Sequence, residues 1–370
     1  MFKLFTIHYS LFTIIWLACS KPAVEAPPVV PVTGLKDLTS QVLIGSPIDV
    51  ANNKSAKYAT TIQSELNAGQ SLWYARWGGW IGNNSYNFSS LNTNINWMKE
   101  NGLSPSVHML VGPDTYMPDW FINGNWSPTT LDSLLRNLIF SIMDVNDNKN
   151  KVDVWNVVNE LFDDEGSYRT NMVWNQLGWE ADSSGLSGKD NINDSHPIFI
   201  RKAFNYCREK TNKKLELRDY NIENNVPMYQ NDKRHKAIYQ LLKHALNTNI
   251  PIDAVGIQGH LSVGNISWLT NNNALQHAVA RFKALGIEVY ITELDAGIGN
   301  QAWSTELAQQ QKADYTNYIS QAIAGGAARI YTWGIQDGLD RGWLTNEHPL
   351  PWDENLNRKP AYYGIQDALK

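Results

Sequence analysis

The chain has 370 residues and a formal net charge of −5, with 31 Lys and Arg against 36 Asp and Glu. It has no run of more than two basic residues, so the electrostatic footprint of a nucleic-acid-binding protein is missing. The 15 Trp and 16 Tyr are numerous for a chain with 18% charged residues, and their flat faces suit stacking on sugar rings. The length fits one large domain, and two cysteines exclude a disulfide framework.

The first 19 residues are typical of a bacterial lipoprotein signal peptide. An apolar stretch runs from Leu4 to Ala18, and Cys19 follows at a position that resembles a lipidation site. Residues 20–36 are Pro-rich and predict a semi-extended tether, followed by a folded domain at 37–370. We expect an exported protein anchored to a membrane through Cys19, in the periplasm or at the cell surface. Secretion without an anchor is the alternative.

From residue 38 onward, short apolar or β-branched runs alternate with segments of helical periodicity, as in repeated strand–helix units. We expect strands at 42–46, 72–77, 104–110, 152–159, 215–221, 253–260, 288–295 and 329–335. We expect helices at 54–68, 91–101, 130–146, 198–211, 232–248, 273–285 and 305–325. These alternations predict an α/β fold, a single (β/α)₈ TIM barrel. Its active site should lie at the C-terminal ends of the strands.

Two of the expected strands end in a glutamate. The fourth ends in Val157-Val158-Asn159-Glu160, and the seventh in Tyr290-Ile291-Thr292-Glu293. Strands four and seven lie on opposite sides of an eight-stranded barrel, so the two carboxylates can face each other across its mouth. Retaining glycosidases use two carboxyl groups about 5–5.5 Å apart. The pair therefore predicts a retaining glycoside hydrolase.

Around these glutamates the chain resembles glycoside hydrolase family 10, the endo-β-1,4-xylanase family, from about residue 41 to residue 370. The family motif Trp-Asp-Val-Val-Asn-Glu appears at 155–160 as Trp-Asn-Val-Val-Asn-Glu, and Ile-Thr-Glu-Leu-Asp appears unchanged at 291–295. The family's Gln-x-His, eighth-strand and closing motifs appear at 258–260, 332–337 and 359–362.

The resemblance implies a role for individual residues. Glu160 would be the acid/base and Glu293 the nucleophile. His260 would donate a hydrogen bond that keeps Glu293 ionised, with Asp295 orienting His260. The implied substrate-binding residues are Asn159, His108, Gln258, Trp333, Trp343, Arg76, Trp77, Tyr220 and Asn221.

The implied activity is endo-cleavage of β-1,4-xylosidic linkages in xylan or a decorated xylan by double displacement. The partner is the polysaccharide itself, and we expect a monomer that contacts a membrane only through its lipid anchor. The mechanism needs no cofactor. The spacing of the eight His and two Cys predicts no metal site.

The sequence departs from the family motifs at positions that bind the sugar in that family. The second-strand Glu-Asn-Glu-Met-Lys-Trp reads Leu-Trp-Tyr-Ala-Arg-Trp at 72–77, so Trp73 and Arg76 replace the family's Asn and Lys. In the third strand Gly112 replaces a stacking Trp, and in the fifth Arg218 replaces an Asn. Arg76 and Arg218 would suit an acidic substituent such as a glucuronic acid.

Two other functions stay open. One is a retaining hydrolase of the same barrel clan that acts on a different β-glycan. The other is a non-catalytic glycan-binding surface lipoprotein. Retention of both carboxylates and of the His260–Asp295 pair argues against pure binding, which needs none of them.

Overall fold

The computed structural model describes residues 33–53, 55–223, 232–270, 272–338 and 344–370. The expected signal peptide with Cys19, most of the expected tether, and Trp343 lie outside these residues.

Eight parallel strands form the centre of the domain. They are β1 (Leu43–Gly45), β2 (Ala68–Leu72), β5 (Ser104–His108), β6 (Val154–Asn159), β9 (Lys214–Asp219), β10 (Ala254–Ile257), β12 (Glu288–Gly297) and β13 (Arg329–Thr332). Each pairs with its neighbour in this order from β2 to β13, and β13 pairs with β1. Hydrogen bonds from Ile48 N to Gln70 O (2.8 Å) and from Gln70 N to Ser46 O (3.0 Å) join β1 to β2. The ring is closed, and the predicted (β/α)₈ barrel is confirmed.

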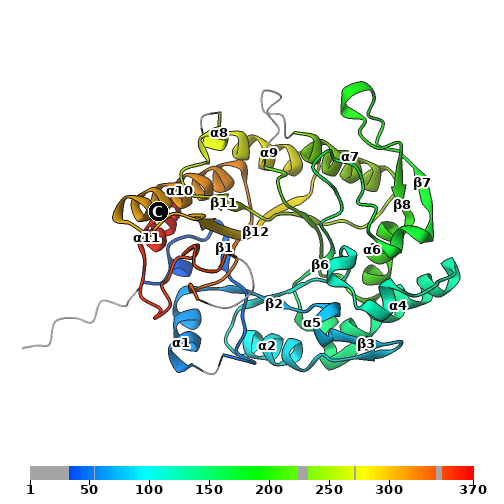
Figure 1. Cartoon of the computed structure of the whole chain (residues 1–370), viewed down its shortest axis with the longest axis horizontal. Coiled ribbons are helices and arrows are strands. Elements are labelled where there is room, and N and C mark those ends of the chain that lie inside the picture. The colour runs from blue at the N-terminus through cyan, green and yellow to red at the C-terminus, as the bar shows by residue number, and fades with distance from the viewer. Residues whose placement is uncertain (1–32, 54, 224–231, 271, 339–343) are drawn as a thin grey trace, which may run out of the picture. The chain divides into compact units, whose positions relative to one another are not determined.

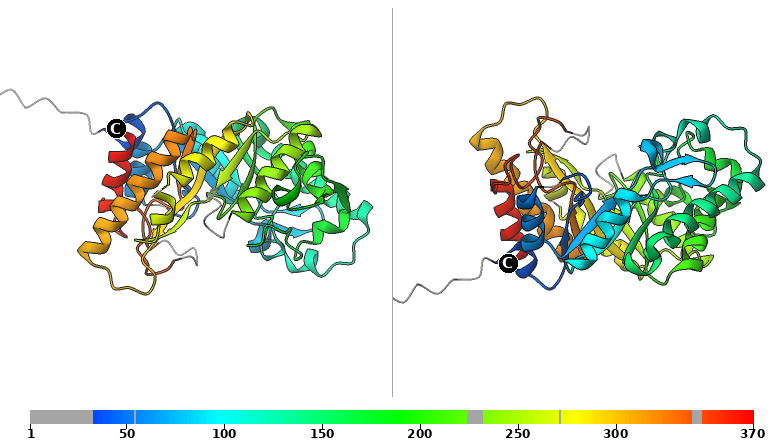
Figure 2. Two further views of the ribbon diagram at one scale, coloured as in Figure 1. Left: turned by 90° about the horizontal axis from the view of Figure 1, so that it is seen from above. Right: turned by 90° about the horizontal axis from the view of Figure 1, so that it is seen from below.

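Helices surround the strands (Figure 1). The longer ones are α1 (Ala56–Glu65), α2 (Ser89–Glu100), α4 (Pro128–Asp144), α6 (Ile198–Lys210), α7 (Lys233–Asn247), α9 (Ala274–Lys283), α10 (Thr305–Gly325) and α11 (Pro360–Leu369). Three short helices are α3 (Asp119–Ile122), α5 (Asn148–Lys151) and α8 (Ser267–Thr270). The C-terminal α11 packs beside α10 (Figure 2).

Helix α4 illustrates why these segments are helical. Ser127 caps its N-terminus by accepting a hydrogen bond from Thr130 N at 3.1 Å, and Pro128 occupies the first turn, where no N–H is needed. Leu131, Leu135 and Leu138 recur at helical spacing and are buried against the barrel. Burial of this apolar face, more than intrinsic propensity, stabilises the helix.

All seven predicted helices are present, with ends within three residues of those expected. The strand predicted at 72–77 is wrong, because β2 ends at Leu72 and residues 75–79 form an irregular helical turn. Gly78 has φ 83° within that turn, which is incompatible with an extended strand. The aromatic residues that suggested a strand lie on the loop that follows it.

Several elements were not predicted. They are the short helices α3, α5 and α8, the C-terminal α11, the hairpin of β3 (Trp80–Gly82) and β4 (Ser85–Tyr86), the hairpin of β7 (Trp179–Ala181) and β8 (Ser195–Pro197), and the short β11 (His260–Ser262) that extends beside β12.

Partly buried hydrogen bonds hold the β7–β8 hairpin together and connect it to His244 of α7. His196 Nε2 lies 2.7 Å from Asp182 Oδ1, and His244 Nε2 lies 3.2 Å from Glu180 Oε1. His244 Nδ1 accepts from Ser183 N at 3.0 Å. Asp182, His196 and His244 are residue types that bind metals, but here their close-lying atoms are already engaged in hydrogen bonds within the protein.

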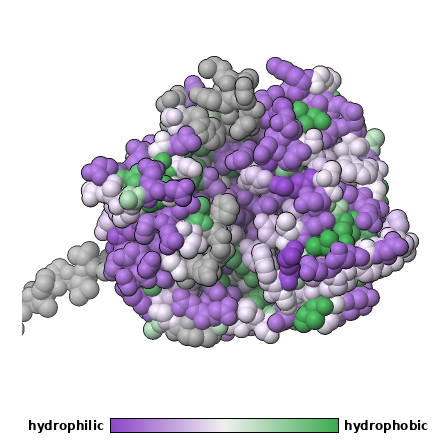
Figure 3. Space-filling model, viewed as in Figure 1, coloured by the Kyte–Doolittle hydropathy of each residue, from purple (hydrophilic) through white to green (hydrophobic). Residues whose placement is uncertain are grey.

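The surface seen in Figure 3 is mainly hydrophilic, with hydrophobic residues in small patches. Among the described residues, no helix combines the length and apolar character needed to cross a membrane.

Charged side chains occupy part of the barrel interior. Arg218 on β9 donates from Nε to Glu216 Oε1 at 2.7 Å and from Nη2 to Glu216 Oε2 at 3.1 Å, and both side chains are buried. Gly256 on the neighbouring β10 gives Glu216 its space, since a Cβ there would lie 2.1 Å from Glu216 Oε1. A side chain at position 256 is therefore incompatible with the ion pair as it stands.

Gly256→Ala should lower the free energy of unfolding by about 2 kcal/mol or more, because overpacking displaces neighbouring groups. Gly82 is the matched control, since an added Cβ there meets nothing within 4 Å, and Gly82→Ala should stay within about 0.5 kcal/mol of wild type. Urea unfolding measures both variants. Equal stability of the two would contradict the close approach of Gly256 to Glu216.

Candidate active site

Glu160 follows β6 directly and points its carboxylate into the barrel mouth. Its backbone N donates to Arg218 O at 2.9 Å, so β9 holds the residue in place. Its Oε1 accepts from Gln258 Nε2 at 3.1 Å and from the Tyr116 hydroxyl at 3.3 Å. The carboxylate is thus positioned by donors from two other parts of the barrel.

The backbone at Glu160 is strained. Its φ is 56°, in the left-handed region that costs a non-glycine residue on the order of 1–3 kcal/mol. Asp219 stabilises the turn, because its Oδ2 accepts from Leu161 N at 3.0 Å and from Phe162 N at 3.3 Å. Arg234 Nη1 in turn donates to Asp219 Oδ1 at 3.0 Å. Burial raises the pKa of Asp219 to about 6, against the opposing charge of Arg234, so Asp219 is ionised at neutral pH.

Glu293 lies within β12 and is buried. Its backbone N donates to Gln258 O at 2.8 Å. On the side chain, Oε1 accepts from Arg218 Nη1 at 3.0 Å and Oε2 lies 3.3 Å from His260 Nε2. His260 stands opposite Asp295 in the β11–β12 register, with Nδ1 3.0 Å from Asp295 Oδ1. A row of charged groups therefore lines one side of the mouth.

These neighbours determine the protonation states. Burial alone would raise the pKa of Glu293, but His108, His260 and Arg218 together lower it to about 2. Burial alone would lower the pKa of His260, but Asp295 and Glu293 raise it to about 10. Burial and the charge of Arg218 lower the pKa of His108 to about 3. At neutral pH Glu293 is an anion, His260 a cation and His108 neutral.

The two glutamates share their surroundings. Gln258 contacts both, through its side chain with Glu160 and through its backbone carbonyl with the N–H of Glu293. Burial raises the pKa of the Tyr116 hydroxyl, and the negative charges of Glu160 and Glu293 raise it further. An ionised carboxylate held by cations and a second carboxylate held by an amide and a hydroxyl are the two groups that double displacement requires.

Asn159 lies beside this pair with no partner for its amide. Its side chain is buried, and neither Nδ2 nor Oδ1 has a hydrogen-bond partner among the described residues. An unsatisfied buried amide costs about 1–3 kcal/mol, which a bound hydroxyl group would relieve. The Trp333 ring lies 5.4 Å from the His108 ring and 6.2 Å from the His260 ring, forming an aromatic wall near the carboxylates.

A second aromatic group stands at the rim. The Tyr74 ring lies 4.7 Å from that of Trp77 and 5.9 Å from that of Tyr116. Trp77 is 64% exposed, which is unusual for so large an apolar side chain. Arg76 is also exposed, and its Nη2 lies 3.3 Å from Asp119 Oδ1.

Tyr220 and Asn221 follow β9 on the same end of the barrel. The Tyr220 ring packs under Arg234 at 3.8 Å, and its hydroxyl accepts from Arg169. Asn221 is exposed with φ 53°. Trp343, the remaining expected binding residue, lies outside the described residues.

Two expectations about sugar contacts are corrected. Arg218 does not face a substituent on the sugar: it is 1% exposed, and its donors are directed at Glu216, Glu293 and the Nδ1 of His108. Trp73 is also buried, with Nε1 donating to Asn87 O at 3.0 Å, and it belongs to the core. Neither Tyr116 nor the contact between Arg218 and Glu293 was predicted from the sequence.

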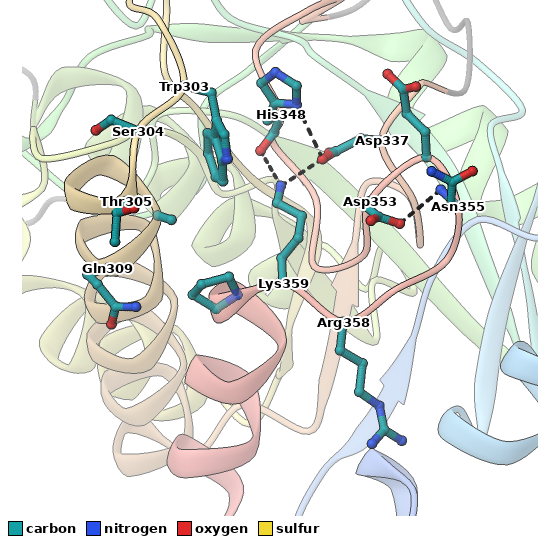
Figure 4. Close-up of a pocket in the computed structure, with 13 residues that line it drawn as sticks. Trp303, Ser304, Thr305, Gln309, Asp337, His348, Asp353, Asn355, Arg358 and Lys359 are labelled. Atoms are coloured by element: carbon teal, nitrogen blue, oxygen red, sulfur yellow. Dashed lines mark hydrogen bonds and ion pairs between the residues drawn. The ribbon is translucent and has the colours of Figure 1, made fainter.

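A separate cavity of about 690 Å³ lies at the N-termini of α10 and α11 (Figure 4). Lys359 reaches into it and donates to Asp337 Oδ2 at 2.7 Å, His348 O at 2.6 Å and Leu350 O at 2.7 Å. Lys359 thereby fixes the loop between β13 and α11. This contact gives the closing motif at 359–362 a structural role.

Comparisons with known proteins identify the family. A sequence model of glycosyl hydrolase family 10 matches residues 35–368. The chain is 29% identical over 290 residues to an endo-1,4-beta-xylanase of Agaricus bisporus, covering 77% of each chain. It is 31% identical over 287 residues to endo-1,4-beta-xylanase A of Phanerodontia chrysosporium, covering 76% of this chain and 62% of the other.

A solved structure shares the fold. Xylanase 10B from Thermotoga petrophila RKU-1, in complex with xylobiose, superposes with a TM-score of 0.77 at 24% identity, covering 91% of this chain and 97% of the other. The family match spans nearly all of the described domain, so the chain belongs to glycosyl hydrolase family 10.

Proposed function

We propose that this protein is a retaining endo-β-1,4-xylanase that cuts xylan or a decorated xylan by double displacement. The observation that carries the proposal is the pairing of Glu160 and Glu293 around Gln258, with Glu293 held as an anion by His260 and Arg218. Membership of glycosyl hydrolase family 10 and similarity to proteins named endo-1,4-beta-xylanase support xylan as the substrate.

In the first step Glu293 attacks the anomeric carbon, and the bond to the leaving glycosidic oxygen breaks. Glu160 donates its proton to that oxygen, so the departing chain leaves as an alcohol. The product is a glycosyl ester on Glu293. Gln258 and Tyr116, which contact the Glu160 carboxylate, hold it on the side of the leaving group.

In the second step water attacks the same carbon while Glu160 takes a proton from it. The bond to Glu293 breaks and its electron pair returns to the carboxylate, which restores the enzyme and retains the anomeric configuration. His260 stabilises the returning charge, and Asp295 keeps its ring in place.

Asn159 is proposed to bind a hydroxyl group of the sugar at the cleavage position. Its buried amide has no protein partner among the described residues, and such a contact is expected to strengthen as charge develops on the sugar ring. His108 and Trp333 pack beside the same space and would orient that ring.

Replacing the carboxylates tests the proposal directly. Glu293→Ala should reduce the release of reducing sugar from xylan by at least about 10³-fold, because no nucleophile remains. Glu160→Ala should lose activity on xylan but keep more of it on aryl xylobiosides, whose leaving groups need no proton. Added azide should accelerate that variant by replacing the attacking water.

Glu354→Gln is the control, because Glu354 is exposed beside the cavity of Figure 4. It should retain the wild-type rate. The substrate panel includes linear xylan, decorated xylan and mixed β-glucans. Binding without cleavage of any of them would favour the glycan-binding alternative, and cleavage of β-glucan but not xylan would favour the other hydrolase.

We further propose that Trp77 stacks on a sugar ring on the non-reducing side of the cleavage point. Its 64% exposure beside Tyr74 and Tyr116 leaves ring surface available at the mouth. An exposed indole held edge-on by two tyrosines is a rigid platform for the apolar face of a sugar.

Trp77→Ala should raise the KM for xylan by about 3- to 10-fold with little change in kcat, since the contact is equally available to substrate and transition state. Trp179→Ala is the matched control, because Trp179 is 46% exposed on the β7–β8 hairpin. Steady-state kinetics measure both. The same KM for the two variants would argue against stacking at Trp77.

We also propose that the protein is exported and anchored through a lipid on Cys19. The apolar segment before this cysteine and the Pro-rich segment after it support the proposal. Cys19→Ala should move the protein from the membrane fraction to the soluble fraction and abolish labelling with radioactive palmitate. Cys207→Ala, at a buried free thiol, should keep both properties. Labelling that survives Cys19→Ala would contradict the anchor.

A further inference from the structure

Arg218 contacts both glutamates of the proposed active site, Glu160 through the backbone and Glu293 through its carboxylate. Its backbone carbonyl accepts from Glu160 N at 2.9 Å, and its side-chain Nη1 donates to Glu293 Oε1 at 3.0 Å. It pairs in register with Asn159 on β6. The position therefore touches three residues of the proposed machinery.

The arginine belongs to a chain of alternating charges. In order, the chain runs Glu216, Arg218, Glu293, His260 and Asp295, and successive members lie within 3.3 Å. It begins in the barrel interior and reaches the mouth. Four of the five groups are buried and His260 is partly buried, and each has a partner of opposite sign on at least one side, which makes their burial tolerable.

The barrel is built to hold this arginine. Glu216 binds it bidentately, which fixes the guanidinium plane, and Gly256 leaves the space that Glu216 occupies. In the family's fifth-strand motif, a neutral Asn stands at the position of Arg218. An amide offers a hydrogen bond at that position, whereas a guanidinium adds a permanent charge.

We propose that Arg218 is a positioning residue that fixes Oε1 of the nucleophile, keeps that carboxylate ionised in acid, and stabilises it as the leaving group of the second step. Glu216 anchors the arginine. The inference rests on the proposed function, in which Glu293 is the nucleophile.

The groups that face Glu293 come from several elements. They are His108 from β5, Arg218 from β9, His260 from β11, and Tyr116 from the short 3₁₀ helix at 114–116. Above its pKa of about 3 His108 is neutral, so Arg218 and His260 supply the positive charge at working pH.

The sign of the pH effect follows from this arrangement. Glu293 must be ionised to attack, so activity is lost as the pH falls through its pKa, which the surrounding charges hold at about 2. Removing the charge of Arg218 leaves the effect of burial less opposed and raises the pKa of Glu293. The same change raises the pKa of His108, whose charge then offsets part of that rise. The acid limb of the pH–rate profile then moves to higher pH.

The test uses Arg218→Asn combined with Glu216→Gln, so that no unpaired charge is left in the barrel. The acid limb of kcat/KM should rise by about 1 pH unit or more. The substrate dinitrophenyl β-xylobioside has a leaving group that departs easily, so the second step limits the rate. On it, kcat should fall at least about 10-fold and a burst of dinitrophenol should appear, because release of the sugar from Glu293 becomes slow.

Arg218→Lys separates charge from geometry. A lysine keeps the positive charge but loses the bidentate contact with Glu216, so the acid limb should stay near its wild-type position while kcat falls. This variant also keeps the test informative if the double variant does not fold. Arg329→Gln, which removes an arginine bonded to Ser104 and Tyr331 at the start of β13, should leave the acid limb unchanged.

If the folded double variant has the same acid limb and the same kcat as wild type, the proposal is overturned and Arg218 is a structural residue. Failure of the proposed function looks different, because wild type itself would then release nothing from xylan or the aryl xylobioside. In that case, NMR titration of isotope-labelled Glu293 still measures its pKa in wild type and in the double variant. Equal values would reject the role of Arg218 independently of activity.

Discussion

The buried carboxylate of Glu293 is the constraint on which the rest of the site depends. An ionised carboxylate that has lost its water is tenable only where cations and donors replace that water. Here His260 covers one oxygen and Arg218 the other. Arg218 is buried and His260 is partly buried, and each has its own anion, Asp295 for His260 and Glu216 for Arg218. Neutralising the buried charge of Glu293 therefore involves a network of five side chains, including its own.

The strand order of the barrel makes this neutralisation possible. β9 lies between β6 and β10, so its backbone can hold Glu160 while its side chain at position 218 crosses the interior to β12. β11 continues alongside β12 beyond β10 and brings His260 opposite Asp295. Polar contacts inside a closed barrel are strong because little water competes for them. Contacts from β9 also hold Glu160 in a strained backbone conformation. Part of the stability of the fold is therefore used to maintain the site.

The sequence predicted the barrel correctly, and the two glutamates that it singles out do lie near each other around Gln258, because both features leave local patterns in the sequence. Buried strands read as apolar runs, and a carboxylate at the end of such a run stands out. The failures have equally physical causes. The aromatic run at 72–77 resembles a strand in composition, yet Gly78 bends it into a turn. Glu216 and Arg218 stand two residues apart, which places them on one face of a strand, but spacing alone does not reveal that this face meets Glu293. Tyr116 ends a three-residue 3₁₀ helix (Asp114–Tyr116), which is too short for any periodicity to mark it.

The departures from the family pattern form one connected rearrangement at the rim. A side chain at Gly112, where the family has a stacking Trp, would begin 2.7 Å from Met109 Cε and 3.4 Å from the Tyr116 ring. Tyr116 thus occupies space beside the missing indole and adds a hydroxyl that reaches Glu160. Trp77 stands on the other side of Tyr116, with ring centroids 6.1 Å apart, and offers an exposed indole from a different strand end. An aromatic surface is therefore retained at the mouth but supplied from new positions. This rearrangement leaves the two carboxylates and their charge partners in place.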